Sequence, residues 1–385
     1  MSKEDQRVSK PKPLIECFEE LTDPRMDRTR LHKLVDILVI GLCSQLTGGE
    51  GLKDMPVFGK AKQDWLKTFL ELPEGIPSYD TFRRVYAAID PHHFLDCFVQ
   101  WVQGICPTLE EETVAIDGKA LRRALNDGDS IPYIVNAWAS ESGLVLGQVK
   151  VKDKSNEITA IPELLRVLQL EGCIVTMDAM GCQKDIAADI IDKHADYVLA
   201  LKGNHANIHE EIQVFFADAV APCATQCADT VAKGTMDFHQ TIEKNHGRVE
   251  TRRYWQSTDI EWFEDRLLWK GLKSIGMVES IRNIKGKSSI ERRFFLLSLP
   301  LDAKGFGKAT RNHWSVENSL HWSLDVTFRE DDSRARTMNA AQNLATLRRI
   351  ALNLIKKDRS KKCSQRQKRI FAALDLDFLK HLLGI

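Results

Sequence analysis

Residues 112–204 alternate short apolar runs with amphipathic segments, and this alternation restricts the possible folds more than any other feature of the chain. TVAI at 113–116 and CIVTM at 173–177 are short enough to be buried strands. Between them, 131–151 predicts two strands joined by a turn at Glu141-Ser142-Gly143, and a helical pattern follows from 157. The order strand, hairpin, helix, strand, helix, strand predicts an α/β domain with a mixed sheet.

Two of these apolar runs are followed directly by an aspartate. Asp117 follows TVAI, and Asp178 follows CIVTM. Ligands of open α/β sheets bind beyond the strand ends, so both side chains are candidates for a site. An acid after a buried strand also commonly begins a turn, and either aspartate alone is better explained in that way. On neighbouring strands, the pair favours a functional role.

A third acid lies within 311–332, which reads RNHWSVENSLHWSLDVTFREDD. In a helix, His313, Glu317 and His321 would share one face. The simpler alternative is an amphipathic helix with a solvated polar face. If Glu317 packs across the strand ends, three carboxylates converge, and such oxygen ligands suit Mg²⁺ or Mn²⁺. A zinc hydrolase built on His313, Glu317 and His321 is a further alternative, although the spacing matches no common zinc motif.

The flanking regions differ from this α/β segment. Residues 1–105 predict an all-helical N-terminal domain for DNA binding, with Ser78 or Asp80 capping a helix that carries two arginines; a plain helical bundle is an equal alternative. Residues 106–335 form the expected core, interrupted at about 206–305 by a β-rich insertion. Residues 336–385 are a basic helical region. Ten basic residues and one acid between 348 and 369 indicate a phosphate-facing surface, or else a solvated helical face.

Composition indicates a folded protein of a reducing compartment. With 54 basic and 54 acidic residues, affinity for a polyanion must come from local clusters. The nine cysteines are scattered without a C-x2-C pair, which indicates free thiols. The N-terminus has no signal-peptide pattern, and the longest apolar run, 34–43, is about half a membrane span. We therefore expect a cytoplasmic protein without membrane contact.

Five motifs together resemble a known family. They are IDGKALR around Asp117, VTMDAMGCQKDIA around Asp178, YVLALKGNH at 197–205, the HGRxExR pattern at 246–252 and HWSVENSLHW around Glu317. In this order, from about residue 15 to 357, they are similar to the DDE transposases of bacterial insertion sequences. The branch of H-repeat-associated proteins linked to Rhs elements is the nearest match.

The resemblance implies a fold, a reaction and a set of residues. It implies a ribonuclease-H-like mixed-sheet core with a β-strand insertion between the second Asp and the Glu. Asp117, Asp178 and Glu317 would bind Mg²⁺, with Mn²⁺ as a substitute, for metal-dependent DNA cleavage at element ends and 3′-hydroxyl strand transfer. Double-stranded DNA is the implied partner, bound by a homodimer associated with the nucleoid.

The resemblance also predicts contacts to DNA and leaves alternatives open. Thr310, His313 and Leu324 occupy the positions of a Tyr, an Arg and a Lys in the wider superfamily, so other residues must supply the positive charge. The candidates are Lys119, Lys202, Arg248, Arg252, Arg311, His313 and His321. Trp255, Trp262 and Trp269 could stack on a flipped base, but at least two of them are expected in a small β core. A nuclease without strand transfer and a decayed DNA-binding protein are the rival functions.

Overall fold

The N-terminal region is entirely helical where it is described. The computed structural model describes residues 12–106, 109–124, 131–151, 157–219, 234–245, 248–284 and 287–385. The first range contains α1 (Leu14–Glu19), α2 (Leu34–Leu46), α3 (Asp54–Ala61), α4 (Gln63–Leu66), α5 (Tyr79–Ala88) and α6 (Pro91–Ile105). Ser78 caps α5 by accepting a hydrogen bond from the Thr81 amide at 3.3 Å, whereas Asp80 lies inside the helix. Of the two predicted caps, Ser78 is confirmed.

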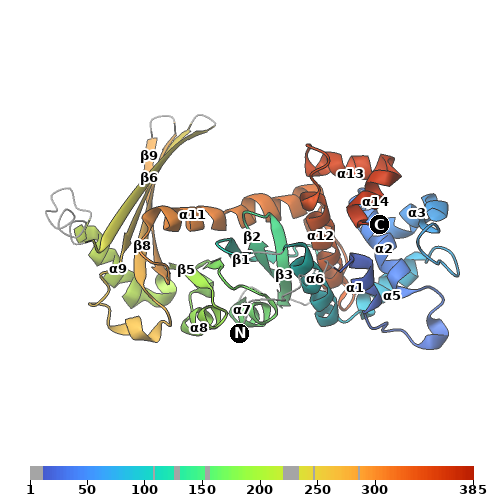
Figure 1. Cartoon of the computed structure of the whole chain (residues 1–385), viewed down its shortest axis with the longest axis horizontal. Coiled ribbons are helices and arrows are strands. Elements are labelled where there is room, and N and C mark those ends of the chain that lie inside the picture. The colour runs from blue at the N-terminus through green and yellow to red at the C-terminus, as the bar shows by residue number, and fades with distance from the viewer. Residues whose placement is uncertain are drawn as a thin grey trace, which may run out of the picture.

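The C-terminal helices complete this helical lobe. They are α12 (Ala340–Lys357), α13 (Gln365–Leu374) and α14 (Leu376–Leu383), which lie beside α2, α5 and α6 in Figure 1. Four of the ten basic residues predicted to face phosphate are buried, namely Arg348, Arg349, Lys368 and Arg369. The prediction of a phosphate-facing surface is therefore wrong for these four residues, because α12 and α13 turn their side chains into the lobe.

A single mixed sheet of nine strands runs through the rest of the described residues. Its order is β3-β2-β1-β4-β5-β9-β8-β7-β6. The strands are β1 (Thr113–Ala120), β2 (Tyr133–Ala139), β3 (Leu144–Val151), β4 (Ile174–Met177), β5 (Asp196–Leu201), β6 (Met236–Asn245), β7 (Arg248–Ser257), β8 (Ser274–Ile284) and β9 (Lys287–Leu297). Only the β1–β4 and β4–β5 pairs are parallel. This confirms the ribonuclease-H-like mixed α/β core.

The β-rich insertion extends the central sheet instead of forming a sheet of its own. β9 pairs antiparallel with β5, and β8, β7 and β6 follow outward. The first six residues of β9 are exposed, and the far ends of these four strands project from the body as an arm (Figure 1). Within the arm region Trp255 and Trp269 are buried, whereas Trp262 is partly exposed and stacks on Phe215. The expectation that at least two of these tryptophans fill a core is confirmed.

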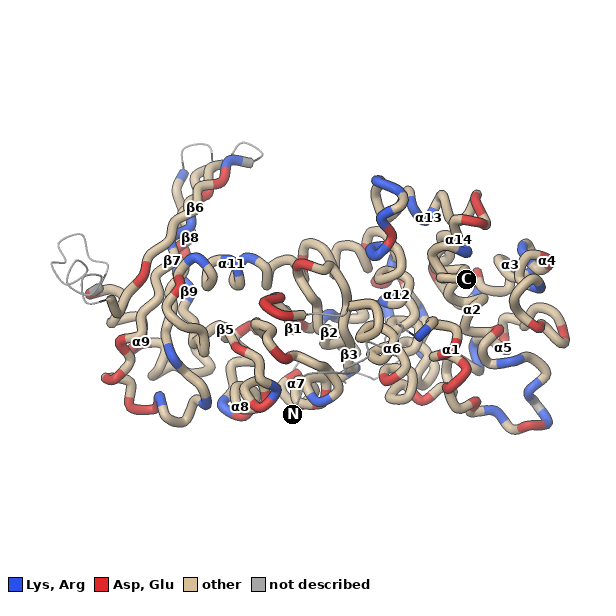
Figure 2. Tube along the Cα trace, in the orientation of Figure 1, with Lys and Arg blue, Asp and Glu red and all other residues tan. Residues whose placement is uncertain are grey.

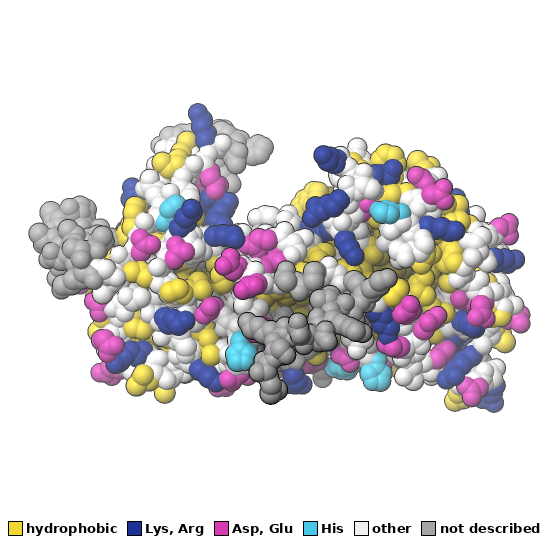
Figure 3. Space-filling model, in the orientation of Figure 1, with side chains coloured by type: hydrophobic (Ala, Val, Ile, Leu, Met, Phe, Trp, Pro, Cys, Tyr) yellow, Lys and Arg dark blue, Asp and Glu magenta, His cyan; other side chains and the backbone are white. Residues whose placement is uncertain are grey.

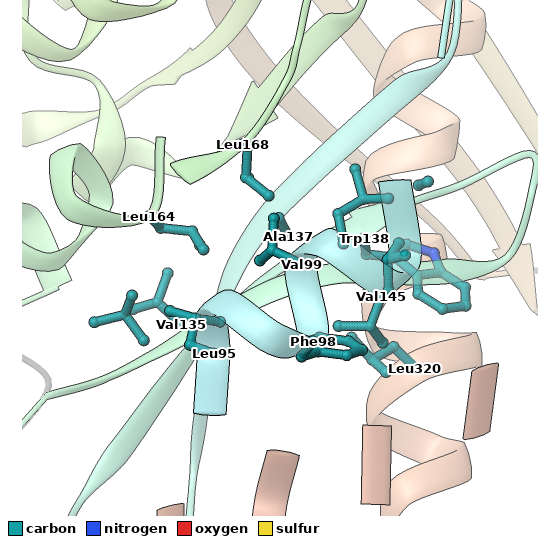
Figure 4. Packing of buried hydrophobic residues seen from close by; sticks show 14 of the residues in the cluster. Leu95, Phe98, Val99, Val135, Ala137, Trp138, Val145, Leu164, Leu168 and Leu320 are labelled. Atoms are coloured by element: carbon teal, nitrogen blue, oxygen red, sulfur yellow. The ribbon is translucent and has the colours of Figure 1, made fainter. Parts of the chain in front are cut away.

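Helices cover the sheet and connect it to the helical lobe. α7 (Glu157–Val167), α8 (Lys184–Asp192) and α9 (Ala206–Ala219) belong to the α/β layer, and α11 (Ala303–His313) crosses the sheet toward the lobe. In the core of Figure 4, α6 and α7 pack on β3. Gly147 makes this approach possible, since a Cβ there would lie 3.1 Å from Leu164 Cδ1. Leu320 joins the same core, which anchors the segment around Glu317.

No helix in the described ranges is both long enough and apolar enough to cross a bilayer.

Candidate active site

Asp117, Asp178 and Glu317 line one cavity of about 510 Å³. Its wall is formed by β1, the ends of β4 and β5, β9 and the last turn of α11. Figure 2 shows acidic residues gathered beside β1, between the arm and the helical lobe. The structure therefore brings together the three carboxylates that the sequence singled out from segments 200 residues apart.

The parallel pairing of β1 and β4 sets the positions of the two aspartates. Ile116 and Met177 are the last registered pair, and Asp117 and Asp178 follow directly. Adjacent strands are about 4.8 Å apart, so the two side chains start as neighbours. The expectation that Asp117 ends its strand is wrong, because β1 continues to Ala120 through its antiparallel pairing with β2. Asp117 instead marks the point where pairing with β4 stops.

Asp178 also has a local structural role. Its Oδ1 accepts a hydrogen bond from the Met180 amide at 3.0 Å and caps a short 3₁₀ helix at Ala179–Gly181. The turn holds the carboxylate at the strand end and leaves its second oxygen available. Turn initiation, one of the two interpretations offered by the sequence, is therefore confirmed for Asp178, and its membership of a functional site stays a prediction.

Glu317 lies on a widened helix. After α11, the chain forms two π-helical segments, Val316–His321 and Ser323–Thr327. Val316, Leu320 and Leu324 are buried, as the apolar pattern predicts, while Glu317 is exposed to the cavity. Such π-helical turns are rare and occur frequently at functional sites. Apolar periodicity cannot separate a π turn from an α turn over so few residues, which explains why the widening was not predicted.

The carboxylates repel one another. Burial raises the pKa of Asp117 to about 7, and the negative charges of Asp178 and Glu317 add to the shift. Glu157 contributes in the same direction and was missed from the sequence. It is buried at the start of α7, and its carboxylate packs so closely on Gly118 that any side chain at 118 would collide with it. Gly118, the residue after Asp117, was the feature of the sequence that could have indicated a close neighbour at this position.

The oxygen donors suit a hard divalent cation, although they form an open set. Within the described parts of the chain, no three Asp, Glu, His or Cys side chains already converge as a metal cluster. The donor chemistry nevertheless fits Mg²⁺ or Mn²⁺, which retain water in part of their coordination shell. Burial, and after it the charges of Asp178 and Glu317, raise the pKa of Asp117, so a bound cation would stabilise the ionised form of this carboxylate.

The two histidines on the Glu317 face line the same cavity but are uncharged at neutral pH. His313 Nδ1 lies 3.0 Å from Thr176 Oγ1, and burial lowers the pKa of His313 to about 4. His321 Nδ1 lies 3.8 Å from Asp117 Oδ2, and burial again lowers its pKa to about 4. Both rings can hydrogen-bond to a phosphate or to Asp117, but neither adds positive charge.

The predicted basic contacts are distributed unequally. Lys119 lines the cavity but is buried, with Nζ 2.7 Å from Asp325 Oδ1 and 2.9 Å from Asp331 Oδ1. Lys202 lines the cavity and is exposed. Two carboxylates therefore compete with DNA for Lys119, whereas Lys202 is accessible.

The other predicted basic contacts belong to the arm or lie near it. Arg252 is buried, with Nη2 2.7 Å from Glu250 Oε1. Arg311 is exposed on α11 and borders a side cavity of about 170 Å³ beside the carboxylate cavity. Arg248 opens β7 opposite Asn245, near the tip of the arm. Neither Arg252 nor Arg311 lines the carboxylate cavity itself.

These features define an α/β protein with a ribonuclease-H-like mixed sheet and a cavity lined by three carboxylates, and comparison with known proteins gives the family. Residues 109–354 match the model described as transposase DDE domain, and residues 15–102 match DDE_Tnp_1-associated. The chain belongs to the DDE transposase family.

Relatives of nearly the same length make the assignment more particular. The chain is 38% identical over 377 residues to putative transposase YncI of Escherichia coli O157:H7, covering 96% of this chain and 94% of that protein. It is 36% identical over 381 residues to H repeat-associated putative transposase YhhI of E. coli K12, covering 97% and 98%. This confirms the predicted resemblance to the H-repeat-associated branch.

Proposed function

We propose that this protein cuts DNA at the ends of a mobile element and joins the freed 3′-hydroxyl to target DNA. Asp117, Asp178 and Glu317 are the proposed metal ligands, with Mg²⁺ as the working ion and Mn²⁺ as a substitute. The observation that carries the proposal is the position of these three acids in one cavity, where burial, together with the negative charges of Asp178 and Glu317, raises the pKa of Asp117 to about 7. A divalent cation bound from solution would relieve the repulsion between these carboxylates.

The bound metal would supply the activation of a water or a 3′-hydroxyl and the stabilisation of the leaving oxygen at phosphorus. The protein's own residues orient the site around it. Thr176 holds His313, and the 3₁₀ turn holds Asp178. Neutral His321 beside Asp117 can hold a proton at Nδ1 without adding charge. No nucleophilic Ser or Cys is required by this chemistry.

The surface supports DNA as the substrate. Figure 3 shows the arm and the helical lobe on either side of a hollow, with Lys and Arg side chains on both. Phosphate contacts from such clusters provide affinity without a net positive charge on the chain. We propose that two copies of the protein pair two element ends, and that the reaction takes place on DNA in the cytoplasm, at the nucleoid.

The proposed function can be tested with labelled DNA that carries the terminal repeats flanking the gene. In Mg²⁺ or Mn²⁺, the wild-type protein should nick at the repeat boundary, and Asp178→Ala should abolish nicking while DNA binding persists. Asp192→Ala is the matched control, because Asp192 is an exposed aspartate bound to Lys270 and distant in the fold from the cavity. If wild type and Asp178→Ala both bind and neither cuts, the catalytic proposal is wrong.

A second assay separates transposition from simple cleavage. Pre-cut ends with a free 3′-hydroxyl, incubated with a target plasmid, should become covalently joined to it. If cutting occurs and joined products never form, the protein is a ribonuclease-H-like nuclease without strand transfer. If only binding is seen, a catalytically decayed DNA-binding protein is the better description.

A further inference from the structure

The cations around the carboxylate cavity differ in what already neutralises them. Lys119 is bound by Asp325 and Asp331, and Arg122 Nε lies 3.4 Å from Asp331 Oδ2. The other cationic side chains that line the cavity in the described chain are Lys202, which is exposed, and Arg293, whose Nη2 lies 2.7 Å from Oε1 of the exposed Glu291. Arg293, on β9, was not among the residues predicted from the sequence.

The sheet register brings Lys202 and Arg293 level with each other. Leu201 and Phe294 are the last pair between β5 and β9, and Lys202 and Arg293 occupy the next position. In the same way, Asp178 follows the pair Met177–Leu199 and is level with Ala200. Because side chains alternate along a strand, Asp178, Ala200 and Lys202 share one face. The two cations thus lie about 7 Å, two residues, further along the face that carries the carboxylates.

Arg293 is held in place by its neighbours. Its guanidinium lies 4.6 Å from the centre of the Trp314 ring, and its Nε donates to Glu291 Oε1 at 2.8 Å. Trp314 follows α11 directly and is three residues before Glu317. A stacked guanidinium has fewer conformations to lose on binding an oxyanion and still presents donors at its free edge. Placing two like charges opposite each other costs stability, which favours a role in binding an anion.

We propose that Lys202 and Arg293 form a binding site for a DNA backbone phosphate next to the one that is cut. The acids hold the metal, and this pair holds the neighbouring phosphodiester and thereby fixes the register of the strand. Arg293 also borders the side cavity that Arg282 and Arg311 line, so the strand continues from this site toward the arm. The inference rests on the proposed function, and it supplies the positive charge that His313 lacks.

The test uses Arg293→Gln and the matched control Arg292→Gln. Arg292 is adjacent in sequence but lies on the opposite face of β9, with Nε 2.8 Å from Glu279 Oε2. Binding is measured on a fluorescein-labelled terminal-repeat duplex in which one phosphate at a time, around the repeat boundary, is replaced by an uncharged methylphosphonate. For wild type we expect about tenfold weaker binding when the contacted phosphate is neutralised.

Arg293→Gln should bind the unmodified duplex about tenfold more weakly, reduce the dependence of log K on log[salt] by about one, and lose sensitivity to methylphosphonate at that position. Arg292→Gln should keep the wild-type interference pattern. An Arg293→Gln pattern identical to wild type, or the same loss in Arg292→Gln, would overturn the site. A wild type that shows the interference but never cuts would contradict the proposed catalysis and leave the phosphate site supported, whereas absence of binding would overturn both.

Discussion

Two carboxylates near β1, the buried Glu330 and the half-buried Asp117, have opposite environments. Glu330 is 1% exposed and faces three cations, with Arg349 Nη1 at 2.7 Å, Lys119 Nζ at 3.7 Å and Arg348 Nη1 at 3.9 Å. Asp117 lies two positions before Lys119 on the same strand, and its charged neighbours are other acids. The pKa of Glu330 is lowered to about 2 by Arg349, Lys119 and Arg348 despite its burial, whereas the pKa of Asp117 rises to about 7.

The comparison of Glu330 with Asp117 distinguishes an acid that is paired within the protein from an acid that is available to bind a ligand. A buried charge is costly unless it is paired, and the cations nearest to this part of β1 are paired with Glu330. The protein could have neutralised Asp117 and Asp178 in the same way. Leaving them unpaired beside a cavity is consistent with a site that a divalent cation completes.

The two groups are mechanically connected. Arg349 Nε donates to Asn136 Oδ1 at 2.7 Å, and Asn136 is the register partner of Asp117 on β2. Through this hydrogen bond, α12 and the segment around Glu330 hold the strand pair that carries Asp117. Glu330 and its paired arginines thus help to hold Asp117 in position.

We expect the largest effect on stability from neutralising Glu330, the paired acid. Glu330→Gln removes the anion and leaves Arg348 and Arg349 without their carboxylate partner in the interior. We expect the free energy of unfolding at pH 7 to fall by about 3–5 kcal/mol, as measured by urea denaturation. Glu261→Gln is the control, since Glu261 is 83% exposed and bound to Arg266, and it should change stability by less than about 1 kcal/mol. Equal effects of the two variants would remove the distinction between scaffold and surface acids.

The pH dependence gives an independent check on Glu330. Its folded-state pKa lies below its ordinary value of 4.5, so its ionisation stabilises the fold above that pH. This contribution should disappear as the pH falls from 4.5 toward 2. Glu330→Gln should therefore lose less stability than wild type across that window.

Neutralising Asp117 should change the free energy of unfolding in the opposite direction from neutralising Glu330. Asp117 has a folded-state pKa of about 7 against an ordinary 3.8, so the folded protein binds the extra proton and wild type loses stability as the pH rises through this window. Without divalent metal at pH 8, Asp117→Asn should be more stable than wild type by on the order of 2–4 kcal/mol. At pH 3 the two should be equal. The measurement is urea denaturation in EDTA at both pH values.

Adding Mg²⁺ should narrow the difference in stability between wild type and Asp117→Asn at pH 8. A metal ion that binds the folded state stabilises wild type, and it binds the variant more weakly because the variant lacks one of the carboxylates. A less stable Asp117→Asn at pH 8 in EDTA would show that Asp117 is already compensated within the protein. The comparison with Glu330 would then no longer identify the metal site.

The sequence predicts the parts of this arrangement that depend on local pattern. Apolar runs place Asp117 on a strand and Asp178 directly after one, and the four-residue spacing places Glu317 with His313 and His321 facing one cavity. It cannot predict which cation meets which anion. Lys119 looks like a free basic residue after an aspartate, yet its partners Asp325 and Asp331 come from a segment 200 residues away. Extension of the central sheet by the insertion depends equally on long-range pairing.

The smallest expected effects concern the C-terminal basic run, where charge alone was a poor guide. Arg369 is buried and donates to the carbonyl oxygens of Gln45, Gly49 and Thr327, so it fastens the end of the π-helical segment to the α2 terminus. Arg366, on the same helix, is exposed. Arg369→Ala should lower the free energy of unfolding by about 2–3 kcal/mol because three buried carbonyls lose a charged donor.

Arg366→Ala should stay within about 0.5 kcal/mol of wild type in the same urea titration. On a labelled duplex, Arg366→Ala is the one of the two that can weaken DNA binding directly, through loss of a surface charge. If Arg369→Ala matches Arg366→Ala in stability and weakens DNA binding more, Arg369 faces the phosphate and the burial argument fails for this run. If only Arg369→Ala loses stability, then basic residues follow the same rule as Glu330. Charged side chains with partners inside the protein stabilise the fold, and charged side chains without such partners are available to bind a ligand.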